Sequence, residues 1–141
     1  MESVAGPRLA SGLRISVMRL SRRMRQAPSS TLSPTQIATL ATLERHGPMT
    51  LGELAAQERV QPPSMTRVIM HLDDLGLVTR SAHPTDGRQV IASVTQAGQD
   101  LLESDRRRRD EWLAERLVEL DPDEIAVLER AAVILDKIAN S

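Results

Sequence analysis

The side chains best suited to chemistry in this sequence are hydrogen-bonding groups in two short stretches. The first is Gln61-Pro62-Pro63-Ser64-Met65-Thr66-Arg67, and the second is Asp86-Gly87-Arg88. Serine, threonine and glutamine can bond phosphate oxygens or base edges, and an arginine can bind guanine through two parallel hydrogen bonds. This is the chemistry of recognition rather than of bond breaking, so both stretches favour contact with double-stranded DNA.

Residue types that would support catalysis or metal binding are sparse. The three histidines, His46, His71 and His83, are far apart in the sequence, and the chain has no cysteine. A zinc site or a hydrolase triad would need ligands or catalytic groups at spacings that are not found here. We therefore expect no enzyme activity, no metal and no cofactor. A metal-responsive sensor and a helical module that binds only proteins remain as alternatives.

Composition indicates a helical core in a chain of single-domain size. The 141 residues are 40% apolar and 26% charged, with one Trp and neither Phe nor Tyr. Leu, Ile, Val, Met and Ala suit helix packing, and the scarcity of rings argues against stacking on single-stranded bases. The sequence shows no apolar run of roughly 20 residues and no secretory signal, so we expect a cytoplasmic protein without a membrane partner.

Charge is distributed unevenly, although the formal net charge is only −1. Residues 1–26 hold six arginines and one acid, and residues 112–141 hold three basic and seven acidic side chains. The segment 48–95 has four arginines against five acids, so DNA contact there must depend on how each side chain is placed. The N-terminal arginines have two interpretations: pairing with the acidic C-terminal segment of a partner chain, or contact with flanking DNA.

Capping patterns and apolar spacing predict about six helices. Residues 9–26 repeat apolar side chains at helical steps, and Ala27-Pro28-Ser29-Ser30 ends this pattern. Three later helices each begin at a capping residue followed three positions on by Gln or Glu: Ser33 with Gln36, Thr50 with Glu53, and Asp121 with Glu124. The expected helices span 9–26, 34–46, 51–58, 62–75, about 99–120 and 122–138.

The segment 62–95 combines a helix with a β-hairpin. Met65, Val68, Ile69, Leu72 and Leu75 form an apolar stripe that we expect to be buried, and Gly76 is expected to end the helix in a left-handed conformation. Two β-prone runs then flank Asp86-Gly87, a pair typical of tight turns in which glycine adopts a positive φ. A short helix, a turn, a second helix and a hairpin predict a mainly α (α+β) winged helix-turn-helix with a two-stranded wing.

Four stretches together resemble the MarR family of bacterial winged-helix transcriptional regulators. Asp86-Gly87-Arg88 is followed after five residues by Val94-Thr95, which differs from the family's wing signature only in Val94 for Leu. Pro62 to Arg67 resembles the start of the recognition helix. Leu75-Gly76-Leu77-Val78 resembles its junction with the wing, and Thr95-Gln96-Ala97-Gly98 resembles the start of the dimerising helix.

The resemblance implies a homodimeric repressor that binds a pseudo-palindromic operator, in a bacterium and at its nucleoid. Arg88 would enter the minor groove, and Asp86 would orient it without touching DNA. Asp86 can also act simply as a turn former. The implied DNA contacts are Gln61, Pro62, Ser64, Thr66, Arg67 and His71 on the recognition helix, and Arg80, His83, Asp86 and Arg88 on the wing.

The resemblance also implies a division into three parts. Residues 1–30 would form an N-terminal dimerisation helix, 31–96 the DNA-binding domain (recognition helix about 62–75, wing about 77–95), and 97–141 the C-terminal dimerisation helices. The expected dimer contacts are Leu9, Leu13, Trp112, Leu128, Leu135 and Ile138. A small-molecule effector that releases the DNA would contact Val17, Leu20, Leu40 and His46.

Overall fold

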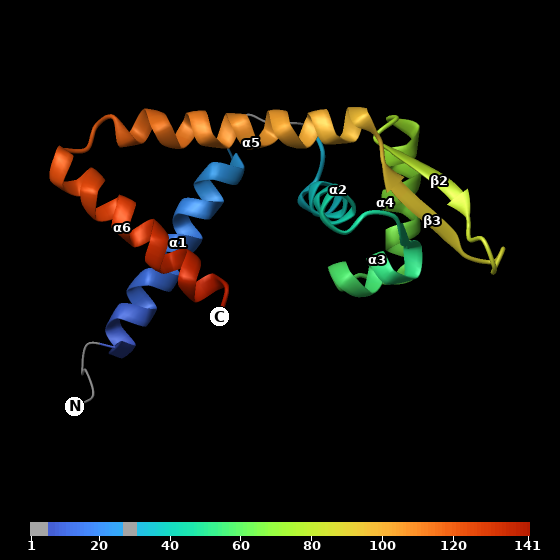
Figure 1. Ribbon diagram of the computed structural model, residues 1–141, viewed down its shortest axis with the longest axis horizontal. Helices are drawn as coiled ribbons and strands as arrows, with labels where there is room; N and C mark the ends of the chain where they lie inside the picture. The colour runs from blue at the N-terminus through green and yellow to red at the C-terminus, as the bar shows by residue number, and fades with distance from the viewer. Residues whose placement is uncertain (1–5, 27–30) are drawn as a thin grey trace. The chain divides into compact units, whose positions relative to one another are not determined.

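The computed structural model describes residues 6–26 and 31–141 and consists of six α-helices and three short strands within that range (Figure 1). Its elements are α1 (Gly6–Gln26), α2 (Pro34–His46), β1 (Met49–Thr50), α3 (Leu51–Glu58), α4 (Pro62–Asp74), β2 (Val78–Ala82), β3 (Val90–Val94), α5 (Gln96–Leu117) and α6 (Pro122–Ala139). The break predicted at 27–30 lies outside the described residues.

The chain divides into two compact units. A central unit spans Ser29–Arg106, and a terminal unit combines Met1–Pro28 with Arg107–Ser141. The boundary falls inside α5, which begins in the central unit and ends in the terminal one. The three-part division expected from the sequence stays a prediction.

All three predicted capping boxes are formed. The Ser33, Thr50 and Asp121 side chains each accept a hydrogen bond from the backbone N–H three residues on. The side chain at that third position accepts one in return from the N–H of the capping residue. These bonds satisfy amides that have no partner within the helix, so the helices begin where the sequence predicted.

The wing is part of a three-stranded antiparallel sheet with the order β1-β3-β2. Val78 pairs with Val94 and Ala82 with Val90 in the hairpin, while Met49 and Thr50 pair with Ala92 and Ile91. The hairpin was predicted, but the third strand was not. β1 is only two residues long and continues directly into α3, so it anchors the start of the helix-turn-helix to the base of the wing.

The core of the central unit joins every element that carries a candidate DNA contact. It is formed by Leu40 and Leu43 of α2, Leu54 of α3, Met65, Ile69 and Leu72 of α4, Val78 of β2, Ala92 of β3 and Leu102 of α5. Of the expected stripe on α4, Met65, Ile69 and Leu72 are buried and Val68 is partly buried. Leu75 was wrongly included, because it lies at the C-cap beyond the last helical turn and remains 50% exposed.

Two glycines fix the junctions on either side of the wing. Gly76 has φ +76°, which confirms the predicted left-handed end of α4. Gly98 lies in the first turn of α5, where an added Cβ would clash with the Leu77 carbonyl oxygen and would be 2.7 Å from Cγ2 of Val94. Thr95 completes the junction, because its hydroxyl donates to the Gly76 carbonyl at 2.7 Å and accepts from the Gly98 N–H at 3.2 Å.

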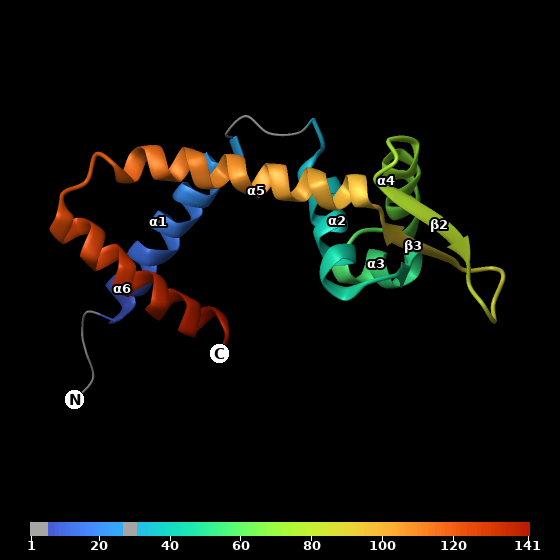
Figure 2. The same cartoon turned by 45° about the horizontal axis from the view of Figure 1, so that its top comes forward.

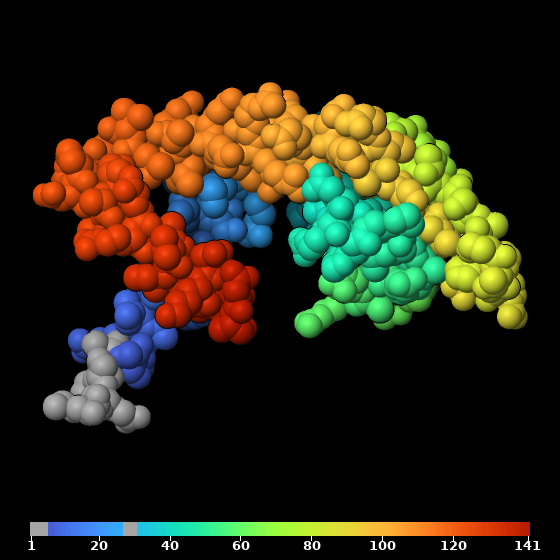
Figure 3. Space-filling view, in the orientation of Figure 1, coloured from blue at the N-terminus to red at the C-terminus, as the bar shows by residue number. Residues whose placement is uncertain are grey.

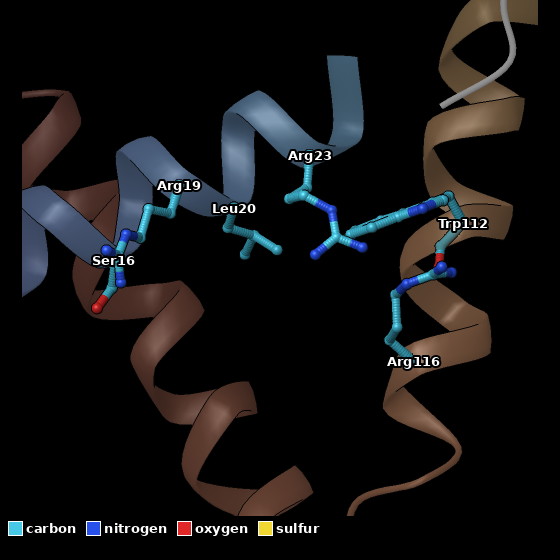
Figure 4. Close-up of a pocket in the computed structure, with 6 residues that line it drawn as sticks. All are labelled: Ser16, Arg19, Leu20, Arg23, Trp112 and Arg116. Atoms are coloured by element: carbon cyan, nitrogen blue, oxygen red, sulfur yellow. The ribbon is translucent and has the colours of Figure 1, made fainter. Parts of the chain in front are cut away.

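The terminal unit has a very different surface. Within the described residues, neither α1 nor α6 contains a buried side chain. Large apolar side chains remain exposed along α1, and most of those on α6 are exposed too. Trp112 of α5 is half-buried, and the guanidinium groups of Arg23 and Arg116 point toward its ring, 5.5 and 3.9 Å from the centroid (Figure 4).

Candidate DNA interface

The helix-turn-helix is closed by a tight backbone turn between α3 and α4. Arg59 adopts the left-handed region at φ 56°, and its N–H bonds back to α3. The Val60 N–H then donates to the Ala55 carbonyl at 3.0 Å. Ala55 is buried. A larger side chain at this position would prevent the close approach of the two helices. The Thr42 hydroxyl donates to Glu58 at 2.8 Å, which ties α3 to α2.

Helix α4 presents a polar face on the side opposite its buried residues. Met65, Ile69 and Leu72 are fully buried, whereas Thr66, Arg67 and Met70 are exposed. At about 100° per residue, Arg67 projects almost directly away from the core. The predicted contacts Gln61, Pro62 and His71 are also exposed, and Ser64 is partly exposed.

The first turn of α4 offers no free backbone donor. Pro62 and Pro63 have no N–H, and the Ser64 N–H donates to the Gln61 carbonyl at 2.9 Å. Backbone amides of this first turn are therefore not available to hold a phosphate, as they are at many helix N-termini. The Thr66 hydroxyl donates to the Pro62 carbonyl at 3.1 Å, so it can offer only lone pairs outward. The remaining donors are side chains, above all Arg67, which contacts the Ser64 hydroxyl at 3.4 Å.

The tip of the wing is a loop over residues 83–89 (Figure 2), and it contains a tight turn in which Gly87 and Arg88 lie between Asp86 and Gln89. Among described glycines only Gly47 and Gly76 have a positive φ, so Gly87 does not serve the purpose expected for it. The loop is closed instead by the His83 N–H to the Gln89 carbonyl at 3.1 Å and by the Gln89 N–H to the Asp86 carbonyl at 3.0 Å. It projects from the surface of the central unit (Figure 3).

Asp86 organises this loop through its carboxylate. Oδ1 accepts from the backbone N–H of Arg88 at 3.1 Å and from Nε of the same residue at 3.3 Å. Oδ2 accepts from Nε2 of Gln89 at 3.2 Å. The pKa of Asp86 is lowered, chiefly by the backbone N–H of Arg88 and next by its side chain. Asp86 is therefore ionised at neutral pH, while the Arg88 side chain stays 93% exposed.

His83 and Arg80 are less free to reach a ligand than the sequence suggested. Nδ1 of His83 accepts from the N–H groups of Thr85 at 3.2 Å and Asp86 at 3.1 Å, so in the neutral ring the proton is on Nε2. Arg80 of β2 donates to Asp73 of α4 at 2.8 Å. This ion pair joins the wing to the recognition helix and neutralises one of the two adjacent acids at the end of α4.

The structure brings the recognition helix and the wing to a common hollow. Thr66 of α4 and Arg88 of the wing line a depression of about 340 Å³ together with Gln89, Val90 and the first residues of α3, Thr50 to Gly52. Gln89 was not predicted as a site residue. An Asp followed by donors two and three positions later is an Asx-turn pattern, and this pattern was the available signal.

The other candidate residues fall in different places. Leu40 is buried in the core of the central unit, where it is unavailable to a ligand, and His46 is exposed at the end of α2. Val17 and Leu20 are exposed on α1 in the terminal unit. The candidate dimer residues Leu9, Leu13, Leu128, Leu135 and Ile138 are all exposed.

The described ranges contain neither a metal-binding cluster nor a membrane-spanning helix. Across residues 6–26 and 31–141, no three His, Asp or Glu side chains are grouped so that they could hold a metal ion. In the same part of the chain, no helix has both the length and the apolar character needed to cross a bilayer.

A helix pair joined by a tight turn and followed by an arginine-tipped hairpin defines a winged helix-turn-helix, a class of DNA-binding protein. The predicted fold class is confirmed, because a transcriptional regulator from Pseudomonas aeruginosa superimposes with a TM-score of 0.82 at 30% identity over 99% of both chains. A MarR family protein from Bacillus stearothermophilus gives 0.73 at 25% identity over 100% of this chain and 99% of the other.

This chain belongs to the MarR family, whose sequence profile matches residues 32–90. An HTH-type transcriptional regulator of Mycobacterium leprae is 52% identical over 95% of both chains. The HTH-type transcriptional repressor MdtR of Bacillus subtilis is 28% identical over 78% of this chain and 69% of its own length. The family and these relatives are transcriptional regulators, so the chain is a DNA-binding regulator.

Proposed function

We propose that the protein is a homodimeric repressor that binds a pseudo-palindromic operator and acts in the bacterial cytoplasm, at the nucleoid. The observation that carries this proposal is the pairing of an outward-facing Arg67 on α4 with a wing tip that exposes Arg88. Similarity to the repressor MdtR supports repression rather than activation, since its name states that activity.

Arg67 is the side chain on α4 best placed to select bases. It is exposed opposite the buried face, and its fork of N–H donors matches O6 and N7 of guanine. Arg88 at the wing tip is suited to a narrow minor groove, where the electrostatic potential is most negative. The first helical turn lacks free amides, so the donors that would select a sequence belong to side chains.

Dimerisation is supported by the surface of the terminal unit. Leu9, Leu13 and Val17 of α1 are 61%, 37% and 48% exposed, and Ile134 and Ile138 of α6 are 57% and 58% exposed. Isolated apolar side chains on a surface need no explanation, but two helices without any buried residue do. A second copy that covers these helices would give the terminal unit the core it lacks in one chain.

A small-molecule effector completes the proposal, on the strength of family membership alone. Such a ligand must favour one arrangement of the DNA-binding units over another, because equal affinity for both would leave operator binding unchanged. Val17, Leu20 and His46 are candidates for contact with it. Leu40 is a poor candidate because it is fully buried.

The test is binding of the protein to its own upstream DNA, measured by fluorescence anisotropy at two salt concentrations, with light scattering to establish the dimer. We expect affinity for one site to exceed affinity for shuffled DNA by at least roughly a thousandfold, and to fall steeply with salt. Arg67→Ala should lose most of that preference, whereas Arg88→Ala should weaken binding to the site. Binding that ignores sequence, or a monomer at micromolar concentration, would overturn the proposal.

A further inference from the structure

Met70 is an exposed apolar side chain on the face of α4 that also carries Arg67. It is 48% exposed, although the other side of the helix packs three side chains into the core. In the described part of the central unit, residues 31–106, the large apolar side chains left exposed are Met70 and Leu75, and Leu75 lies at the C-cap. One exposed methionine needs no explanation by itself, so the argument depends on where Met70 lies relative to Arg67.

The outward face of α4 carries a basic, then an apolar, then an acidic side chain. At about 100° per residue, Arg67, Met70 and Asp74 project within about 50° of the direction opposite the buried side. Met70 is about 4.5 Å farther along the helix axis than Arg67, because each residue rises about 1.5 Å. Base pairs along a duplex are about 3.4 Å apart. A helix in the major groove whose Arg67 meets a base edge therefore brings Met70 to a base pair one or two steps away.

The chemistry of this side chain matches one feature of the major groove. The C5 methyl group of thymine is the apolar group that base edges present there. The neighbours of Met70 on the outward face cannot use it, because the Arg67 guanidinium only donates hydrogen bonds and the Asp74 carboxylate only accepts them. A methionine side chain is unbranched and flexible, so it can fit against a methyl group beside the base that Arg67 binds. Phosphate oxygens would give Met70 no favourable contact.

We propose that Met70 is a specificity-determining residue that contacts a thymine methyl group in each half of the operator, within about two base pairs of the base bound by Arg67. This inference rests on the proposed operator binding and adds a second selected base to it. Burial of one methyl group changes affinity by about fourfold, and the contact would form twice in a dimer. Together the two contacts are therefore worth roughly tenfold in affinity.

Replacing thymine by uracil tests the contact, because it removes the methyl group and leaves the hydrogen-bonding groups of the base unchanged. The probe is the protein's own upstream DNA, copied once with thymidine and once with deoxyuridine nucleotides, and fluorescence anisotropy gives the Kd for both duplexes. The wild type should bind the uracil duplex roughly tenfold more weakly. Met70→Ala should bind both duplexes equally, with a Kd near that of the wild type on uracil DNA, because these complexes all lack the same contact.

Leu75→Ala is the matched control, since it also shortens an exposed large apolar side chain of the same helix. It should keep the wild-type preference for the thymine duplex. Met70→Gln retains the length of the side chain without its apolar character, so it should lose the preference as Met70→Ala does. Circular dichroism checks that the variants are folded. Single replacements of thymine should then locate the effect at one position in each half of the operator.

The outcomes that overturn the inference differ from failure of operator binding. A wild type that prefers its own site but binds the uracil duplex equally well would exclude the methyl contact and leave the regulator intact. If Met70→Ala keeps the preference and Thr66→Ser loses it, the contact belongs to Thr66. Loss of the preference in Leu75→Ala would indicate a general change in α4 rather than a contact of Met70. A wild type without preference for any site would refute operator binding itself.

Discussion

The carboxylate of Asp86 holds both the backbone N–H and the side-chain Nε of Arg88, at 3.1 and 3.3 Å. Its second oxygen is bonded to Gln89, so the acid is used within the loop while the guanidinium remains almost completely exposed. An acid near DNA is normally repelled by phosphate. Removing the Asp86 carboxylate would remove this repulsion, but it would also release the loop that presents Arg88. The two effects on DNA affinity therefore oppose each other.

We expect the orientation of Arg88 by Asp86 to affect operator affinity more than the repulsion between Asp86 and phosphate does. Asp86→Ala should weaken operator binding by roughly five- to tenfold, and Asp86→Ala/Arg88→Ala should bind no more weakly than Arg88→Ala alone, because both act through one contact. Asp74→Ala is the control, since Asp74 is an exposed acid at the end of α4 and its removal should leave affinity unchanged or higher. Anisotropy with operator DNA measures all four proteins. An Asp86→Ala protein that behaves like Asp74→Ala would contradict the orienting role.

The ionisation of Asp86 provides an independent check. Its pKa should lie below the ordinary aspartate value of 3.8 and should rise in Arg88→Ala, although not fully, because the larger contribution comes from the backbone N–H that alanine keeps. Because the folded-state pKa of Asp86 lies below the unfolded value, its ionised form stabilises the protein above about pH 3.8. This stabilisation is lost as the pH falls through the folded-state pKa. Carboxyl NMR titration measures the shift. A pKa that is insensitive to Arg88 would rule out the side-chain contact.

Gly98→Ala should destabilise the central unit, contrary to the usual effect of this change in a helix. Alanine is normally about 1 kcal/mol more stabilising than glycine within a helix, but a Cβ at this position would clash with the Leu77 carbonyl oxygen. Relieving the clash requires moving α5 away from the base of the wing, at a net cost of about 2–3 kcal/mol. Gly52→Ala in α3 is the control, because its Cβ would meet only Thr50 Oγ1 at 3.9 Å. Urea unfolding compares the free energies of unfolding of the two variants. Equal values would show that the junction between α5 and the wing accommodates the added methyl group.

Asp73→Asn should increase DNA affinity if Arg80 reaches phosphate. The pair is half-exposed and contributes about 0–1 kcal/mol to stability, so the fold should tolerate its loss. A released Arg80 should raise affinity a few-fold for all sequences and add about one to the slope of log affinity against log salt. The gain should disappear in Arg80→Ala. If Asp73→Asn binds DNA as the wild type does, Arg80 serves only to join the wing to α4.

Local patterns in the sequence were sufficient to predict most of the helix boundaries in both units. The capping residues Ser33, Thr50 and Asp121 defined helix starts because their bonds involve neighbours within three positions. Gly76 was predictable for the same reason, since its conformation ends α4 by backbone bonding alone. The family motifs added the chemistry expected of the wing, which composition and periodicity could not provide.

The features that were not predicted from the sequence all depend on contacts between residues distant in sequence or on details of the backbone. β1 forms only because Met49 and Thr50 meet Ala92 and Ile91, some forty residues later. A turn does form at Asp86-Gly87, but Gly87 lacks the positive φ expected of it, and the carboxylate of Asp86 braces the loop. Apolar periodicity marked the stripes on α1 and α6 but did not indicate that one chain leaves them uncovered.

The double proline at the start of α4 has a consequence for how target preference can change over time. Backbone donors would be the same in every descendant of this protein, but here the first turn contributes none. Preference for particular bases then depends on exchangeable side chains at 64, 66 and 67, each reachable by a single codon change. Duplicated copies of such a regulator could diverge toward separate operators while keeping the scaffold intact.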